Sequence, residues 1–262
     1  MRSPQDLGRD ISNGMKLKTP EEIEIMAEGG HILSDILDRL VVAAKPGTTT
    51  KELDDIARKL LKEAGAKSWF VDHEGFPASI CTSINEEVVH GVPSDRILGS
   101  GDVLKIDLGV RYKGFNTDSA RTVLVGEAKD AKKLKLISVT KRALDIGIEQ
   151  AQVGNALKDI GREIQKYVES QDFNVVRELV GHGIGKDVHE PPQVLNYVSP
   201  GEGKEKLEPG LVIAIEPMVV AGHWKIEDGK DGFSFVTKDG GLAAQFEHTV
   251  AITKDGPLIL TK

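Results

Sequence analysis

Two stretches near the start of the chain repeat their apolar residues at steps of three and four. The first runs through Ile23, Met26, Gly30, Leu33, Leu37 and Leu40. This spacing is typical of an amphipathic helix that packs on other structure. A capping box at Thr19 to Glu22, with proline at the first helical position, begins this helix. A second capping box, Thr49 and Glu52, begins another helix, and Gly65 ends it.

The same helix pattern returns 107 residues later. Ala27, Leu37, Val41, Gly47, Leu53, Ala57 and Leu61 correspond to Leu134, Leu144, Ile148, Gly154, Ile160, Ile164 and Val168. β-type runs follow each pair, at 79–90 and 103–125, and then at 174–180, 211–220 and 244–253. We therefore expect an α+β fold of two halves, 15–126 and 127–262, related by a pseudo-twofold axis. Helices would cover one face of a curved antiparallel sheet. Chance similarity between amphipathic helices is the alternative.

One predicted strand carries an acid within an aliphatic run. The segment 103–110 is mostly β-branched and aliphatic, and Asp107 interrupts it. Lys113-Gly114 supplies a turn, and the segment 115–125 has the composition of the returning strand. The sequence therefore predicts a β-hairpin.

The register of this hairpin decides whether two acids meet. If Tyr112 pairs with Phe115, Asp118 lies opposite Gly109 and diagonal to Asp107 on the same face, roughly 7–8 Å away. Two ionised carboxylates placed so closely repel each other unless a cation neutralises them. These residues alone leave open the alternative that one acid is buried and the other faces solvent.

Three further polar residues stand in apolar or glycine-rich stretches. Glu216 lies within LVIAIEPMVV and Glu247 within AAQFEHTVAI, and a buried acid must be paired, protonated or bound to metal. Glycines surround His182 in GHGIGKDVHEPP, which suits an imidazole close to a ligand, although an ordinary loop histidine is the alternative. With Asp107 and Asp118 these residues give four carboxylates and one imidazole. Their charge balances two divalent cations, about 3.5–4 Å apart if two carboxylates bridge them. The oxygen-rich set suits Mn, Fe or Co at least as well as Zn.

Composition narrows the class of protein. With 262 residues, 39% hydrophobic and 29% charged, the chain can bury a substantial core. A formal net charge of -7 disfavours a nucleic-acid partner. Cys81 is the only cysteine, which excludes an internal disulfide and fits a reducing cytoplasm. No apolar run approaches the roughly 18 residues of a membrane span. The polar segment 1–14 is expected to be a disordered, dispensable leader, with one catalytic domain over 15–262.

Five motifs, in order, resemble those of the type I methionine aminopeptidases, in their short bacterial form. They are SICTSINEEVVHGVP, KIDLGVRYKGFNTD, GHGIGKDVHEPP, IEPM and QFEHT, and the resemblance runs from about Met15 to the C-terminus. It implies a pita-bread fold and removal of the initiator methionine from nascent polypeptides with a small second residue. It also implies a cytoplasmic monomer that meets its substrates near the ribosome.

The resemblance assigns roles to individual residues. Asp107, Asp118, His182, Glu216 and Glu247 correspond to the ligands of two divalent metal ions (Co, Mn, Fe or Zn), with Asp118 and Glu247 bridging. Glu216 would also accept a proton from the attacking water. His90 and His189 correspond to unligated histidines that contact the substrate.

The methionine pocket departs from the family pattern. Phe76 and Cys81 fit it, but four positions carry residues other than the expected Cys, Tyr, Phe and Trp: Phe70, His73, Val188 and Phe233. Because Val188 and Phe233 are smaller than expected, we predict a roomier pocket.

Two other functions are the alternatives to this interpretation. Xaa-Pro peptidases share the fold and the ligand set, but they usually carry a large preceding domain, and here about 20 residues precede the first helix. A non-enzymatic, ribosome-associated binding module would be expected to have lost ligands, and this chain retains all five.

Overall fold

The computed structural model describes residues 14–71, 73–127 and 130–262. The predicted leader, 1–14, lies outside these residues except for Gly14. None of the described helices is both long enough and apolar enough to cross a lipid bilayer.

The four α-helices of the described residues form two similar pairs. They are α1 (Pro20–Ala43), α2 (Thr50–Glu63), α3 (Ala131–Gln150) and α4 (Leu157–Ser170). Both predicted capping boxes are formed, at Thr19 and at Thr49. The bounds of α4 are those of α2 shifted by the 107 residues of the sequence repeat.

Among the described residues all strand pairs are antiparallel, as expected, and the strands form four separate sheets. The first half contributes β1 (Lys67–Ser68), β2 (Cys81–Ile84), β3 (Glu87–Val89), β4 (Val103–Tyr112) and β5 (Phe115–Leu124). The second contributes β6 (Asn174–Val175), β7 (Gly181–Gly183), β8 (Glu190–Val194), β9 (Val212–Ile215), β10 (Met218–Val220), β11 (Ile226–Asp228), β12 (Phe235–Thr237), β13 (Ala243–Gln245), β14 (His248–Thr253) and β15 (Gly256–Ile259).

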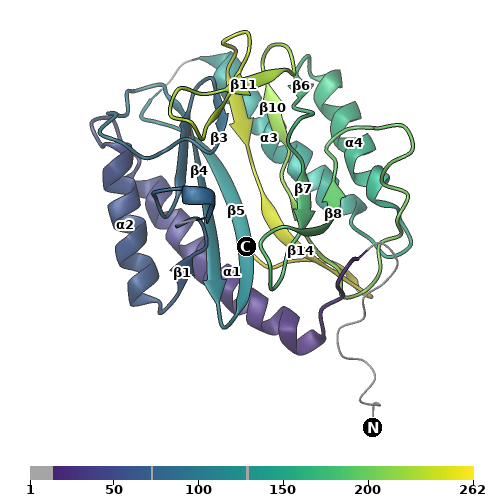
Figure 1. Ribbon diagram of the computed structural model, residues 1–262. Coiled ribbons are helices and arrows are strands. Elements are labelled where there is room, and N and C mark those ends of the chain that lie inside the picture. The colour runs from purple at the N-terminus through teal and green to yellow at the C-terminus, as the bar shows by residue number, and fades with distance from the viewer. Residues whose placement is uncertain (1–13, 72, 128–129) are drawn as a thin grey trace.

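Each helix pair packs on the strands of its own half. Leu37 of α1 shares a buried apolar cluster with Ile106 of β4, and Leu144 of α3 shares another with Ile215 of β9. In Figure 1, α2 lies at the left and α4 at the right, with β4, β5 and β14 between them. Each such apolar side chain contributes about 1.5–3 kcal/mol by burial. The two cores therefore hold the strands between them in fixed positions.

The predicted hairpin is present in the predicted register. Tyr112 pairs with Phe115, and Gly109 pairs with Asp118. Both turn residues have positive φ, 46° at Lys113 and 88° at Gly114, as a two-residue hairpin turn of this kind requires. Asp107 and Asp118 consequently lie on the same face of the hairpin.

The two halves meet where β5 runs beside the start of β14, a junction that we call the seam. The Thr249 hydroxyl accepts a hydrogen bond from the Asp118 N–H and donates one to the Asp118 carbonyl, both at 2.8 Å. The Ser119 hydroxyl donates to the Glu247 carbonyl at 2.6 Å, and the Glu247 N–H donates to Ala120 at 3.0 Å. The seam therefore fixes Asp118 of one half beside Glu247 of the other.

Candidate metal centre and substrate pocket

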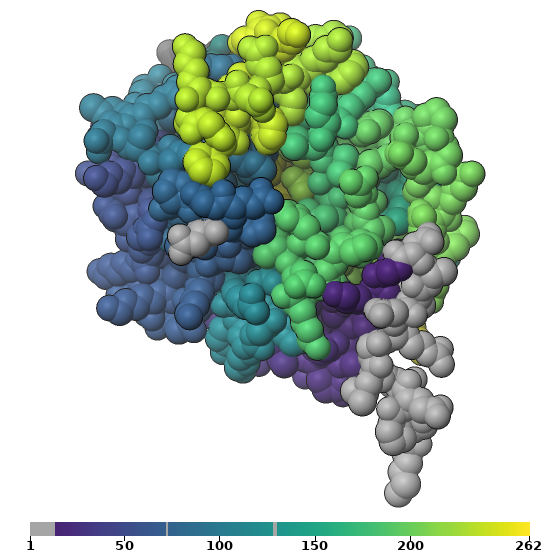
Figure 2. Space-filling model, viewed as in Figure 1, coloured from purple at the N-terminus to yellow at the C-terminus, as the bar shows by residue number. Residues whose placement is uncertain are grey.

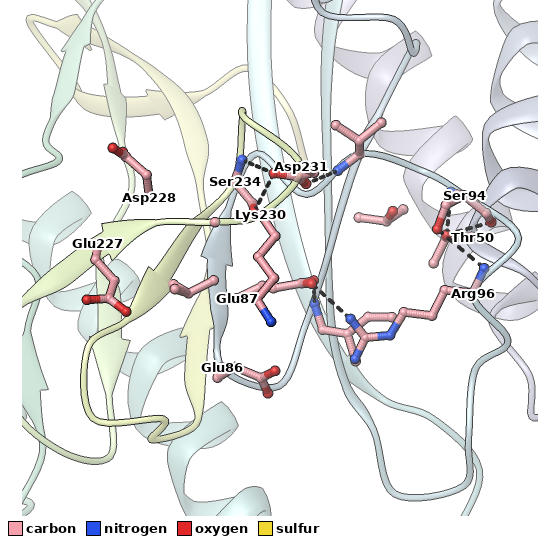
Figure 3. Close-up of a pocket in the computed structure, with 15 residues that line it drawn as sticks. Thr50, Glu86, Glu87, Ser94, Arg96, Glu227, Asp228, Lys230, Asp231 and Ser234 are labelled. Atoms are coloured by element: carbon pink, nitrogen blue, oxygen red, sulfur yellow. Dashed lines mark hydrogen bonds and ion pairs between the residues drawn. The ribbon is translucent and has the colours of Figure 1, made fainter.

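The viewed face of the molecule is hollowed where segments of the two halves meet (Figure 2). One cavity, of about 540 Å³, lies between β2–β3 and β11–β12. Its lining side chains pair largely with one another, Asp231 with Ser234 and Arg96 with Glu87 (Figure 3). None of the five predicted metal ligands lines it. The predicted metal ligands therefore lie elsewhere in the fold.

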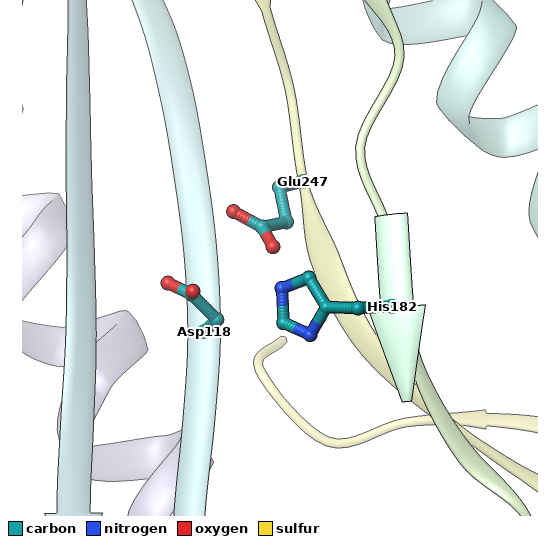
Figure 4. A group of neighbouring side chains, drawn as sticks. All are labelled: Asp118, His182 and Glu247. Atoms are coloured by element: carbon teal, nitrogen blue, oxygen red, sulfur yellow. The ribbon is translucent and has the colours of Figure 1, made fainter. Parts of the chain in front are cut away.

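Three of the predicted ligands converge on one buried point. Asp118 comes from β5, His182 from β7, and Glu247 from the residues just ahead of β14. Their ligand atoms all lie within 4.8 Å of one another (Figure 4). This spacing is compatible with a shared metal ion.

The other two predicted ligands border the same point. Glu216 Oε1 lies 3.7 Å from His182 Nε2, and Asp107 Oδ2 lies 3.5 Å from the Gln245 side-chain amide. Gln245 ends β13, two residues before Glu247. The fold thus gathers five residues that are spread over 141 positions of the sequence.

The surroundings of the four carboxyl groups in this cluster disfavour their ionised form. Burial raises the pKa of Asp107 to about 7. Burial, and then the charges of Asp107 and Glu216, raise the pKa of Asp118 well above its usual value. Burial, and then the charge of Asp107, raise the pKa of Glu216. Burial, and then the charge of Asp118, raise the pKa of Glu247. Four ionised carboxylates would be stable here only with cations beside them.

Unpaired oxygen atoms indicate where such cations fit. Asp107 Oδ1, Asp118 Oδ1 and Glu247 Oε1 are buried, and no described residue offers them a hydrogen bond. Buried polar atoms are normally paired, so three orphaned oxygens at one point need an explanation. Oxygen-rich donors of this kind suit hard or borderline divalent cations.

His182 is oriented as a neutral ligand. Burial, and then His189, lower the pKa of His182 to about 4. Its Nδ1 lies 2.9 Å from the Gly183 carbonyl, to which a neutral ring donates its N–H. The lone pair is then on Nε2, the atom near Glu216. A backbone carbonyl that fixes the tautomer in this way is typical of metal-ligating histidines.

Two cavities adjoin the cluster, and both His90 and His189 line each of them. The larger, about 410 Å³, is also lined by His182 and Glu216. The smaller, about 100 Å³, is lined by Trp69, Phe70, His73, Glu74, Phe76, Cys81 and Phe233. The two shared histidines thus stand between an apolar pocket and the cavity that reaches the cluster.

The small cavity has the aromatic walls that the sequence suggested. Phe76 and Phe233 meet edge to face with centroids 5.4 Å apart, and Phe70 lies 5.8 Å from Phe76. Cys81 is buried in the same apolar cluster and pairs across the sheet with Asp107. Narrow apolar walls of this kind suit a linear side chain.

Sequence reasoning missed Trp69. Its indole nitrogen lies 1.6 Å from the position that a Cβ on Gly109 would occupy, so the ring fills the gap left by the glycine. The indole also meets His189 edge on, with centroids 5.9 Å apart. Its N–H has no hydrogen-bond partner among the described residues. Gly109 was the available signal, because a glycine beside two acids on a buried face leaves space for another side chain.

Comparison with known proteins shows the family to which the chain is similar. The sequence model of metallopeptidase family M24 matches residues 24–254. The methionine aminopeptidase of Clostridium acetobutylicum is 49% identical over 246 residues, which cover 94% of this chain and 98% of the relative. The crystal structure of a methionine aminopeptidase from Rickettsia prowazekii superposes with a TM-score of 0.91 at 39% identity, covering 95% of this chain and all of that one.

A Xaa-Pro dipeptidase from Bacillus anthracis shares the fold more distantly. Its TM-score is 0.75 at 23% identity, and the alignment covers 94% of this chain but 62% of that one. The pita-bread fold expected from the sequence is thereby confirmed.

Proposed function

The chain belongs to metallopeptidase family M24, and we propose that it is a metal-dependent aminopeptidase that removes N-terminal methionine from polypeptides. The observation that carries this proposal is the position of His90 and His189, which line both the apolar pocket and the cavity at the acidic cluster. A peptide whose first side chain occupies the pocket would have its first peptide bond beside the cluster.

We assign two divalent metal ions to the cluster. Asp107, Asp118, His182, Glu216 and Glu247 would hold them, with Asp118 and Glu247 bridging. The four carboxylate charges, and the three buried oxygens that lack partners, support two ions rather than one. Co, Mn, Fe and Zn all accept this donor set, and affinity order alone does not select among them.

Divalent ions bound there would lower the pKa of a water molecule toward neutrality and polarise a carbonyl oxygen. Glu216 is the group that we assign as proton acceptor. Burial and Asp107 raise its pKa in the bare site, and nearby positive charge would return it to the ionised form that can take a proton. The proton could then pass to the leaving amine.

His90 and His189 would orient the substrate. Neither is needed to balance the charge of the cluster, and both have a ring exposed to the cavities. A histidine N–H aimed at the carbonyl oxygen would stabilise the negative charge that develops there.

The apolar pocket would select methionine. Phe76, Cys81 and Phe233 surround a narrow space for an unbranched thioether, with Trp69 along another wall. We infer that the substrates are nascent polypeptides with a small second residue, met in the cytoplasm near the ribosome. The domain over 15–262, its division near 126, and a monomeric state without nucleic-acid or membrane partners belong to the same proposal.

Hydrolysis of short peptides tests this function. Chelated protein reloaded with Mn²⁺ or Co²⁺ should release methionine from Met-Ala-Ser and leave Ala-Pro intact. Release of alanine from Ala-Pro at a higher rate than methionine from Met-Ala-Ser would favour a Xaa-Pro peptidase. Hydrolysis of neither peptide would favour a non-enzymatic binding module.

A further inference from the structure

Lys105 is a buried lysine for which the proposed chemistry has no use. It lies on β4, two residues before Asp107, and its side chain is 1% exposed. Lysines are almost never fully buried unless their charge is compensated. No ion pair of Lys105 is present in the described part of the chain. Its charge must therefore be balanced in another way.

Three backbone carbonyls surround the Lys105 ammonium. Nζ donates to Asn85 at 3.0 Å, to Ala243 at 3.2 Å and to Val103 at 3.3 Å. An ammonium has three N–H donors and no acceptor, so this set uses all of them. The arrangement is a cage of carbonyl oxygens around a cation, comparable in chemistry to those that replace the water around K⁺ in ion-selective filters.

The three carbonyls come from segments that have to be held together. Asn85 lies between β2 and β3, Val103 begins β4, and Ala243 begins β13 in the second half. The Ala243 N–H also donates to the Asn85 carbonyl at 2.9 Å. The ammonium thus sits at a junction of both halves.

This junction adjoins the metal cluster through β4 and β13. Side chains two positions apart on a strand point to the same face, so Lys105 and Asp107 face β13 together. Ala243 bonds to Lys105, and Gln245, two positions on, reaches Asp107 at 3.5 Å. Glu247 follows two residues after Gln245.

We propose that Lys105 is a positioning residue whose ammonium acts as a built-in monovalent cation, fixing β13 against β4 and so setting Asp107 opposite Glu247. Burial lowers the pKa of Lys105 to about 7, and the negative charges of Glu87 and Glu86 oppose this shift. The three carbonyl contacts of Nζ, which are geometric observations, carry the proposal. The proposal rests on the metal site assigned above, because Lys105 acts through its ligands.

Two substitutions separate a cation from a space-filling side chain. Lys105→Ala leaves the carbonyl cage empty, and Lys105→Met fills it with an uncharged chain of similar length. Both should lower Co²⁺ affinity about 10–100-fold, the usual effect of disturbing the supports of metal ligands. K⁺ or NH₄⁺ should restore Co²⁺ affinity and melting temperature in Lys105→Ala, because either ion can occupy the cage. Neither ion should raise the Co²⁺ affinity or melting temperature of Lys105→Met, and neither should change these values in the wild type.

The measurement is Co²⁺ titration, followed by the visible absorption of the bound ion, in KCl and in choline chloride of equal ionic strength. Wild-type Co²⁺ affinity in both variants would overturn the positioning role. The cation role would be overturned if K⁺ changed neither the Co²⁺ affinity nor the melting temperature of Lys105→Ala, or if this variant were unfolded in both salts. If the wild type itself bound no Co²⁺, the proposed metal site would be wrong, while the K⁺-dependent melting of Lys105→Ala would still report on the cage.

Discussion

Replacing Thr249 with valine should loosen the seam and the metal cluster together. The side chains have almost the same shape, so the change removes only the hydroxyl that bonds to both backbone groups of Asp118. An unsatisfied buried donor or acceptor costs about 1–3 kcal/mol. With an N–H and a carbonyl both left unpaired, Thr249→Val should lower the free energy of unfolding by about 2–6 kcal/mol. Because Asp118 is displaced, Co²⁺ affinity should fall about 10–100-fold.

Thr253→Val is the matched control for this experiment. Thr253 lies on the same strand, β14, but its hydroxyl bonds to Gly256 within a partly buried turn away from the cluster. Its loss should cost about 0.5–1.5 kcal/mol and leave Co²⁺ affinity unchanged. Urea unfolding and Co²⁺ titration of both variants give the comparison. If Thr249→Val matched Thr253→Val in both measurements, the seam would not position Asp118.

Three further predictions concern the site. In chelated protein the raised pKa of Asp107 keeps a proton that the unfolded chain loses above about pH 4, so stability should fall from about pH 4 to about pH 7. Mn²⁺ should reverse this fall at pH 7, whereas Asp107→Asn should show a smaller fall in melting temperature. His189→Ala and His90→Ala should retain full metal content while kcat/KM falls about 10²–10³-fold. Metal loss in either variant would make that histidine a ligand. Wild-type protein should cleave Leu-Ala-Ser about 10–200-fold less well than Met-Ala-Ser. Phe233→Trp should widen that ratio and Trp69→Ala narrow it, and ratios unchanged by both would exclude them as pocket walls.

Local rules explain why much of the fold was predictable from sequence. The capping boxes at Thr19 and Thr49 depend on residues three positions apart, and both are formed. The two-residue turn fixes the register of the hairpin. This register pairs Asp118 with Gly109. The helices and the hairpin, together with the sequence repeat and the lone acids in apolar strands, predicted that the two halves meet at the acids.

The unpredicted features depend on contacts between segments distant in sequence. Trp69 enters the site because β1 pairs with β4, and no pattern near residue 69 indicates that pairing. A lysine is expected to be exposed to solvent, yet Lys105 is buried and its ammonium donates to carbonyls of two other segments. The division of the strands into four sheets likewise follows from long-range pairing that periodicity does not encode.

Methionine release by the Glu216→Gln variant tests the central claim most directly. Wild-type protein and the variant are stripped with chelator, reloaded with Mn²⁺ and assayed on Met-Ala-Ser, with bound metal measured in the same samples. Chelated wild type should be inactive and regain activity with metal, while metal-loaded Glu216→Gln should lose at least about 10²-fold in kcat. Full activity in the chelated protein, or in the metal-loaded variant, would contradict the account.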